Sequence, residues 1–260
     1  MRSRFFLYLA LMNLTNAEIK LIHALSSSKG RKKHQAYMVE GIKMVEELLM
    51  SDEEILFIAA RQEWFTANPE ASQQYSSRLL KDRELQKLSN FSSSNQVLAV
   101  ASLSKEKELH IENHELVLVL DTIQDPGNLG TIIRTADWFG IDKIVCSKET
   151  ADAYNPKVVQ ASMGSVFRTK IFYTDLITLL QKHPDSNIYG SLLSGDNIYR
   201  LSLKNTGFII IGNESKGISP EVQKYINQAI YIPIHKNSKA ESLNAAVACS
   251  IILSEFSREI

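Results

Sequence analysis

The 260-residue sequence predicts an α/β protein with a small α/β region followed by a larger one built on a mostly parallel sheet. Two observations support this prediction. From residue 116 onward, short apolar runs alternate with segments whose apolar residues recur at helical spacing, which is typical of a parallel sheet covered by helices. Before residue 103, helical and strand-like segments mix without that alternation, and a charged stretch separates the two regions.

The first region is expected to contain helices at 17–25 and 38–50, where apolar residues fall at helical spacing, and strands at 55–59 and 97–101. A cation-rich loop, SKGRKKH, is predicted at 28–34. Residues 104–114 are highly charged, show little apolar periodicity and are interpreted as a linker. The predicted divisions are an N-terminal extension (1–12), a first domain (13–102), a linker (103–114) and a second domain (115–260).

The second region predicts the elements of a helix-covered parallel sheet. Strands are expected at 116–120, 144–146, 188–192, 208–211 and 229–234. Helices are expected at 131–139, 156–163, 175–182, 219–227 and 245–253. The last helix is a long apolar run, and Ser242 is its predicted N-cap.

Composition leaves the type of partner open. Lys and Arg total 29 and Asp and Glu total 29, so net charge neither favours nor excludes a nucleic-acid partner. Cys146 and Cys249 stand in apolar segments, which favours buried free thiols in a reducing, cytoplasmic compartment, and no Cys/His spacing indicates a metal site. The first twelve residues resemble a short signal sequence, but their apolar run is too short to span a bilayer and Met12 offers a second start. We therefore expect an extended or misassigned start and no membrane segment.

Polar groups follow three of the predicted strands, in the segments DTIQDPGNLGTIIRTAD (121–137), IIIGNESKGIS (209–219) and IPIHKNSKAESLN (232–244). Taken singly, Arg134 is interpreted as a surface cation near the start of a helix that begins at about Asn128. The turn GNESKG (212–217) in the second segment is, taken singly, interpreted as structural. Gly127 and Gly130 do not form a dinucleotide fingerprint, and Ile218 stands where a P-loop needs lysine. Because parallel strands end at the same edge of a sheet, the three segments together predict a ligand site there.

These three segments, in this order, resemble the three motifs of the SpoU/TrmH family of RNA ribose 2'-O-methyltransferases, in the SPOUT superfamily. The resemblance covers roughly residues 116–257, and the stretch SKGRKKHQAYMVEG (28–41) more loosely resembles the L30e-like substrate-binding domain of the same family. It implies a C-terminal chain threaded into a trefoil knot, S-adenosylmethionine as cofactor, no metal, a homodimer, and RNA as substrate. Ribosomal RNA is favoured over transfer RNA.

The resemblance also implies roles for single residues. Catalysis would involve Asn128, Arg134, Glu214, Ser242 and Asn244. The cofactor would be held around Leu193, Gly212, Ile232 and Leu243. The loop at 235–241 is longer than is usual in the family and lacks glycine, so the resemblance does not define the shape of the rim of the cofactor pocket. A guanidinium seldom gives up its proton, so we expect Arg134 to bind the target phosphate and stabilise the developing oxyanion, while that phosphate or Glu214 takes the proton.

RNA contacts are expected first from the cations of the 28–34 segment and then, more weakly, from two cations of the second region. These residues are Lys29, Arg31, Lys32, Lys33, Lys157 and Arg168. Two other classes of protein stay open at this point. A non-catalytic RNA-binding or ribosome-assembly factor would keep the basic segment without binding S-adenosylmethionine. A nicotinamide-dependent oxidoreductase would share the alternation of strands and helices, but it needs the glycine fingerprint that this chain lacks.

Overall fold

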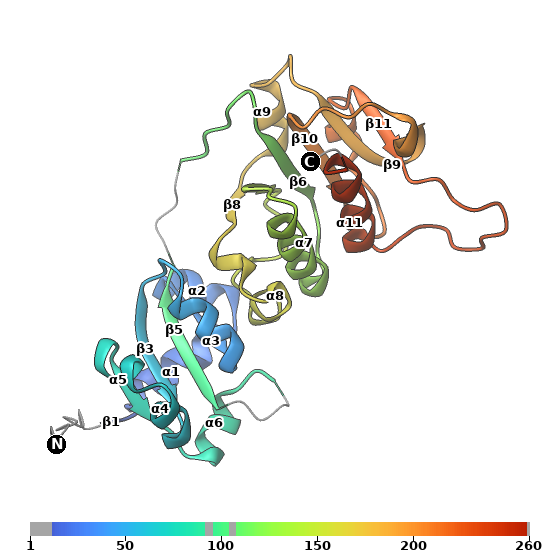
Figure 1. The fold of residues 1–260 in the computed structure, drawn as a ribbon. Helices are drawn as coiled ribbons and strands as arrows, with labels where there is room; N and C mark the ends of the chain where they lie inside the picture. The colour runs from blue at the N-terminus through green and yellow to red at the C-terminus, as the bar shows by residue number, and fades with distance from the viewer. Residues whose placement is uncertain (1–11, 92–95, 104–107, 259–260) are drawn as a thin grey trace, which may run out of the picture. The chain divides into compact units, whose positions relative to one another are not determined.

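The computed structural model describes residues 12–91, 96–103 and 108–258. The chain forms two compact units, the first up to residue 106 together with Tyr154–Pro156 and the second from residue 107 onward without that segment. Each unit has its own sheet and its own core (Figure 1). The extension predicted for residues 1–12 lies outside the described residues except for Met12. In the described part of the chain, no helix has the length and apolar content needed to cross a membrane.

The first unit contains a five-stranded mixed sheet in the order β1-β4-β3-β5-β2. Its strands are β1 (Met12–Asn13), β2 (Ala36–Glu40), β3 (Ile55–Ala60), β4 (Ser77–Leu79) and β5 (Val97–Ser102). Its helices are α1 (Asn16–Leu25), α2 (Ser28–His34), α3 (Ile42–Leu49), α4 (Gln62–Ala67), α5 (Pro69–Gln74) and α6 (Asp82–Leu88). The strands predicted at 55–59 and 97–101 are confirmed. The core gathers Ile22 and Leu25 of α1 against Met38, Phe57 and Leu98 of the sheet.

Two predictions for this unit are wrong. Residues 38–40 belong to the fully buried strand β2, and the helix predicted at 38–50 begins only at Ile42, because Gly41 with φ of 94° separates the two elements. The cation-rich segment at 28–34 is the helix α2, whose first turn is capped by the hydroxyl of Ser27. A single helix was predicted over 38–50 because Met38 and Val39 fit the apolar spacing of a helix as well as that of a buried strand.

The second unit contains a six-stranded sheet in the order β11-β9-β10-β6-β7-β8, in which all neighbouring strands are parallel. The strands are β6 (Leu116–Asp121), β7 (Lys143–Cys146), β8 (Lys170–Tyr173), β9 (Ile188–Asn197), β10 (Gly207–Gly212) and β11 (Gln228–Tyr231). The predicted parallel sheet is thus confirmed. The edge strand β8 was not predicted, since its residues are exposed or half-buried and lack a continuous apolar run.

Helices cover this sheet. They are α7 (Pro126–Trp138), α8 (Pro156–Ser162), α9 (Leu176–Gln181), α10 (Pro220–Gln223) and α11 (Ala245–Phe256), with short 3-10 turns at Ser165–Phe167 and Ile198–Arg200. The apolar side chains of β6 and β10, such as Val117, Val119, Phe208 and Ile210, form the centre of the core. Helices α7 and α11 lie side by side (Figure 1), and the hydroxyls of Thr135 and Ser250 meet between them at 3.2 Å. The trefoil knot stays a prediction.

Candidate functional site

Three loops meet beyond the carboxyl ends of the central strands. The register pairs Gly212 with Asp121, so β10 and β6 end level with each other. The side-chain amide of Asn128 donates to Oε1 of Glu214 at 2.9 Å, and the amide of Asn244 donates to Oδ1 of Asn128 at 2.8 Å. The gathering of Asn128, Glu214 and Asn244 at one edge, which the sequence predicted, is therefore confirmed.

Helix α7 places Asn128 in this cluster. The helix begins at Pro126 with Asp125 as its N-cap, and Oδ1 of Asp125 accepts from the backbone N–H of Asn128 at 2.7 Å. The predicted start near Asn128 was thus two residues late, because Pro126-Gly127 was interpreted as a turn. A capping residue followed by proline at the first position is instead typical of a helix start. Arg134 consequently lies in the third turn of α7, not in the second.

Asn244, not Ser242, caps the last helix. Oδ1 of Asn244 accepts from the backbone N–H groups of Ala246 at 2.9 Å and Val247 at 3.3 Å. The predicted cap was wrong because α11 begins at Ala245, three residues beyond Ser242. With Oδ1 facing the helix, the amide nitrogen of Asn244 is left to donate to Asn128, whose own nitrogen then faces the acceptor Glu214. The carboxylate and the helix N-terminus therefore fix the orientation of both amides.

Glu214 lies in the turn 213–217, opposite the loop that leaves β6. Its carboxylate oxygens face the backbone N–H groups of Gln124 at 3.5 Å and Asp125 at 3.4 Å, in addition to the amide of Asn128. A half-buried carboxylate with this many donors is held in one orientation.

Backbone strain occurs at the start of the same loop. Thr122 follows β6 with φ of 61°, a left-handed conformation that is a genuine outlier for a β-branched residue. Such a residue costs on the order of 1–3 kcal/mol and persists only where the surroundings enforce it. Just before it, the carboxylate of the buried Asp121 accepts from both the backbone N–H and the hydroxyl of Ser219 at 2.7 Å.

Arg134 and Ser242 are the predicted catalytic residues that the hydrogen-bonded cluster does not include. The Arg134 side chain is exposed and makes no hydrogen bond or ion pair with another residue in the part of the chain that the structure describes. Ser242 is likewise exposed, in the loop that leads to Asn244.

The four residues predicted to hold the cofactor follow neighbouring strands or the last loop. Leu193 lies in β9, Gly212 ends β10 and Ile232 follows β11, and the sheet order places these three strands side by side. Leu193 is 81% exposed, Leu243 is 47% exposed, and Leu243 directly precedes Asn244. These exposed leucines, one in β9 and one in the last loop, offer apolar surface of the kind that a nucleoside base needs.

Gly212 tests whether a cofactor fits at this edge. A Cβ atom at this position would lie 2.2 Å from the backbone carbon of Gly217 and from the nitrogen of Ile218. Only glycine therefore allows the turn 213–217 to fold back on β10, with the backbone of Gly217 and Ile218 against the strand end. The residues present fit a cofactor held by backbone groups and apolar side chains.

The loop 234–244 is exposed along its whole length. Apart from the side-chain bonds of Asn244, its described hydrogen bonds are local, such as the donation from the Ser238 N–H to the carbonyl of His235 at 2.8 Å. Figure 1 shows this loop between β11 and α11 extending away from the sheet. The additional residues that make this loop longer than the family pattern, within 235–241, are thus exposed to solvent.

Helix α2 separates its cations into two groups. Lys29, Lys32 and Lys33 are exposed, and their spacing places them on one helical face. Arg31 is only 2% exposed, and its guanidinium donates to the carbonyl of Leu25 at 2.8 Å inside the first unit. The prediction that Arg31 contacts RNA conflicts with this burial, because a cation-rich loop was expected where a helix with one inward face exists.

The two candidate cations of the second region differ. Arg168 donates to the carboxylate of Asp137 at 3.0 Å, so part of its charge is already paired. Lys157 is exposed near the start of α8.

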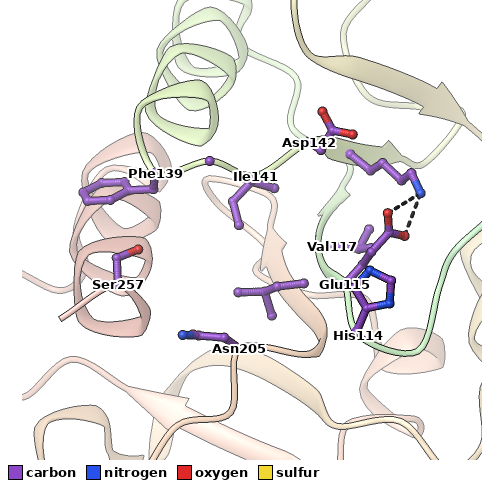
Figure 2. Close-up of a pocket in the computed structure, with 11 residues that line it drawn as sticks. His114, Glu115, Val117, Phe139, Ile141, Asp142, Asn205 and Ser257 are labelled. Carbon is purple, nitrogen blue, oxygen red and sulfur yellow. Dashed lines mark hydrogen bonds and ion pairs between the residues drawn. The ribbon is translucent and has the colours of Figure 1, made fainter. Parts of the chain in front are cut away.

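A pocket of about 270 Å³ lies at the opposite edge of the sheet (Figure 2). Its lining includes Val117 at the amino end of β6, Ile141 and Asn205, and the ion pair between Lys143 and Glu115 at 2.6 Å. Partial burial opposes ionisation of Glu115, but the hydrogen bond from Lys143 holds the pKa of that carboxyl below its usual range. Open parallel sheets bind ligands at the carboxyl ends of their strands, so this pocket is not the candidate site.

Comparison with known proteins agrees with the geometry. The family described as the SpoU rRNA Methylase family matches residues 115–254, more than half of the chain. The chain belongs to the SpoU rRNA methylase family. The MRM3-like substrate binding domain matches residues 16–99, which lie in the first unit. The SpoU match contains all three loops of the cluster.

Relatives of this SpoU family member match it along nearly its whole length. The 23S rRNA (guanosine(2553)-2'-O)-methyltransferase RlmP of Bacillus subtilis is 31% identical over 242 residues, which cover 92% of this chain and 95% of that protein. A putative RNA methyltransferase of the TrmH family from Porphyromonas gingivalis has a similar structure, with 32% identity, a TM-score of 0.84, and 95% and 99% of the two chains covered. The AdoMet-bound rRNA methyltransferase from Sinorhizobium meliloti is 28% identical, with a TM-score of 0.82 and coverage of 96% and 97%.

Proposed function

We propose that this protein transfers a methyl group from S-adenosylmethionine to a ribose 2'-hydroxyl of ribosomal RNA. The observation that carries the proposal is the hydrogen-bonded series Asn244, Asn128 and Glu214, which joins three loops at one sheet edge in a member of the SpoU rRNA methylase family. A relative that matches almost end to end methylates 23S ribosomal RNA, which favours ribosomal over transfer RNA.

We assign the cofactor to residues in β9, at the end of β10, after β11 and in the last loop. Backbone groups around Leu193, Gly212, Ile232 and Leu243 would hold S-adenosylmethionine, and the exposed side chains of Leu193 and Leu243 would contact its base. When bound, the cofactor supplies a methyl group on a positively charged sulfonium. The chain must then orient the ribose hydroxyl toward that methyl group and exclude water.

Arg134 and Glu214 have different roles in the methyl transfer. The planar guanidinium of Arg134 binds the target phosphate and stabilises the negative charge that develops on the ribose oxygen. The hydroxyl proton passes to Glu214 or to the substrate phosphate, because a guanidinium seldom gives up its own proton. Asn128 and Asn244 hold Glu214 and the last loop in register, and the exposed hydroxyl of Ser242 contacts the nucleotide from the same loop.

The first domain, 13–102, binds RNA in this proposal. Lys29, Lys32 and Lys33 present three positive charges on one face of α2, and a stretch of phosphates is the matching partner. Lys157 and Arg168 add weaker contacts from the second domain, 115–260, where Arg168 already forms an ion pair with Asp137. Residues 103–114 remain the predicted linker, although the second unit begins at residue 107 and Leu109 and Ile111 pack against its core.

A homodimer completes the proposal. Trp138 on α7 is 83% exposed and Val247 on the adjacent α11 is 47% exposed, which leaves apolar surface on two helices that already pack against each other. A second copy related by a two-fold axis would cover both residues at once.

We place the protein in the cytoplasm. This agrees with its two buried free thiols, Cys146 and Cys249, because free thiols are typical of a reducing compartment. Burial raises the pKa of the Cys249 thiol to about 12.

Mapping of 2'-O-methyl groups in total RNA, with and without this gene product, tests the function. We expect one ribosomal RNA position to lose its methyl group, and the purified protein to restore it with S-adenosylmethionine. Calorimetric titration should show binding of S-adenosylhomocysteine and no binding of NAD. A loss confined to transfer RNA would assign the other substrate class, and a protein that binds RNA but not S-adenosylhomocysteine would be a non-catalytic factor.

A further inference from the structure

We propose that Asn213 is a positioning residue that holds Glu214 in the site by tying the turn 213–217 to the backbone at the exit of β6. The inference rests on the proposed function in one respect only, which is that Glu214 takes part in methyl transfer. The tie itself is a property of the folded chain and can be tested without activity.

Asn213 uses both ends of its side-chain amide. Its nitrogen donates to the carbonyl of Thr122 at 2.7 Å, and its oxygen accepts from the backbone N–H groups of Ser215 and Lys216 at 3.0 Å. Its backbone also exchanges two hydrogen bonds with Gly217, at 3.0 and 2.9 Å. One residue therefore closes the turn and anchors it to a loop 91 residues earlier in the chain.

The anchor point is the strained residue Thr122. The N–H of Thr122 donates to the hydroxyl of Ser147, and its own hydroxyl donates to the carboxylate of Asp121, both at 3.0 Å. A threonine with φ of 61° needs such partners to stay in place. Strain that several partners maintain at a strand exit is typical of functional sites, and here it fixes the carbonyl that Asn213 binds.

Glu214 follows Asn213 directly and depends on this tie. Its carboxylate meets Asn128 at 2.9 Å and faces the amides of Gln124 and Asp125 at 3.4 to 3.5 Å, all of which follow Thr122 in the chain. Loss of the Asn213 donor would separate the turn from this loop and shift the carboxylate relative to its partners. Errors of about 1 Å at a reacting group lower turnover without preventing binding.

Asn213→Asp removes the donor, which serves the Thr122 carbonyl at 2.7 Å and also Oε2 of Glu214 at 3.4 Å. The new side chain has the same size and keeps an oxygen for the N–H groups of Ser215 and Lys216, but when ionised it cannot donate to the carbonyl of Thr122. We expect kcat at pH 8 to fall at least about tenfold, with KM for S-adenosylmethionine and for RNA changed less than about twofold. Ser215→Ala, in the same turn and without a described side-chain hydrogen bond, is the matched control and should keep the wild-type kcat.

The pH dependence separates positioning from general damage. The carboxyl introduced by Asn213→Asp stands beside the carboxylate of Glu214, whose Oε2 lies 3.4 Å from the Asn213 nitrogen, and this like charge favours the protonated form. Once protonated, the carboxyl regains an O–H donor for the Thr122 carbonyl, so the ratio of the variant's rate to the wild-type rate should rise as pH falls from 8 to 5. A constant ratio across this range overturns the proposal, and so does an unchanged kcat. If Asn213→Asp does not fold, Ser147→Ala removes the support of Thr122 from the other side and should give the same kcat loss with unchanged KM; a normal kcat there also overturns the proposal.

Amide hydrogen exchange gives a readout that needs no activity. In Asn213→Asp at pH 8, exchange should become faster in both connected segments, 122–125 and 213–217, and stay unchanged in β7 and β11. Faster exchange in both segments supports the tie even if the wild-type protein methylates no RNA, in which case only the proposed function fails. Acceleration confined to 213–217 would show that Asn213 serves its own turn alone and would overturn the proposal.

Discussion

The side-chain amide of Asn128 donates to a carboxylate oxygen of Glu214 at 2.9 Å across 86 residues of sequence. Asn128 also accepts from Asn244, 116 residues later, so a single amide connects the three loops of the site. Because an amide has one donor side and one acceptor side, it links a carboxylate to another amide in one orientation only. Asn128 is thus the point at which a change should disturb the whole cluster.

Asn128→Asp should lower methyl transfer at least about tenfold near neutral pH. The variant replaces the donor to Glu214 with a second carboxylate and brings like charges together. Single-turnover rates would measure the loss, and calorimetry with S-adenosylhomocysteine should show cofactor binding retained. Asn205→Asp, at the opposite edge of the sheet, is the matched control. Equal rates for the two variants would remove Asn128 from the site.

Asn244→Ala should destabilise the second unit by about 1 kcal/mol, the usual cost of losing an N-cap. Its side chain caps α11 through Ala246 and Val247, so the free energy of unfolding in urea should fall. Ser242→Ala, two residues earlier and without a described side-chain partner, should leave stability unchanged. A larger loss from Ser242→Ala than from Asn244→Ala would contradict the observed cap.

The elements that were predicted well are those with one dominant pattern. The buried strands β6 and β10 are continuous apolar runs, and only a strand with both faces covered needs such a run, so their place in a parallel sheet followed from sequence. The site followed from the same logic, because polar residues after parallel strands must share an edge. The segments that contain Asn128, Glu214 and Asn244 were found in this way, whereas the roles of these residues were implied by the resemblance to the SpoU/TrmH family.

Where prediction failed, two patterns competed or a partner was distant in sequence. Met38 and Val39 fit a helix until Gly41 with its positive φ is known, and the cap of α11 depends on where the loop ends, not on whether serine is a good cap. Arg31 stands among exposed cations, and only its bond to Leu25 shows that it faces inward. The strain at Thr122 leaves no signal in sequence, because Ser147 and Asn213, which support it, lie far along the chain.

Replacement of Lys29, Lys32 and Lys33 by alanine should flatten the salt dependence of RNA binding. Each lost phosphate contact lowers the slope of log K against log salt by about 0.7 on single-stranded RNA, so three contacts would lower it by about 2. Filter binding between 50 and 200 mM salt would measure the change. An unaltered slope would contradict the assignment of α2.

Arg31→Met is the contrasting variant in the same helix. Its side chain is buried and donates to the carbonyl of Leu25, so the change should lower the free energy of unfolding of the first unit by about 1–3 kcal/mol. The salt slope of RNA binding by the folded protein should stay the same. A flatter salt slope of RNA binding, with an unchanged free energy of unfolding, would indicate that Arg31 does contact RNA.

Trp138→Ser should convert the proposed dimer to a monomer. An indole that is 83% exposed has no described core to stabilise, so the monomer's stability should be nearly unaffected. Light scattering at micromolar concentration would report the mass of each form. Met50→Ser, which removes a side chain 76% exposed in the first unit, is the control and should leave the mass unchanged. A wild-type monomer, or a Trp138→Ser dimer, would contradict the proposed interface.

Arg134→Lys should fold normally, bind S-adenosylmethionine normally and lose at least about tenfold in methyl transfer, or roughly 1.4 kcal/mol of transition-state stabilisation. The side chain is exposed in the third turn of α7 and has no described partner, so lysine, a comparable helix former, should preserve the free energy of unfolding. Lysine keeps the charge but cannot present two parallel N–H groups to a phosphate or an oxyanion. Arg61→Lys, at an ion pair with Asp82 in the first unit, is the matched control and should transfer methyl groups at the wild-type rate. If Arg134→Lys also reaches that rate in single turnovers, its guanidinium is a surface cation and the oxyanion must be stabilised by another group of the cluster.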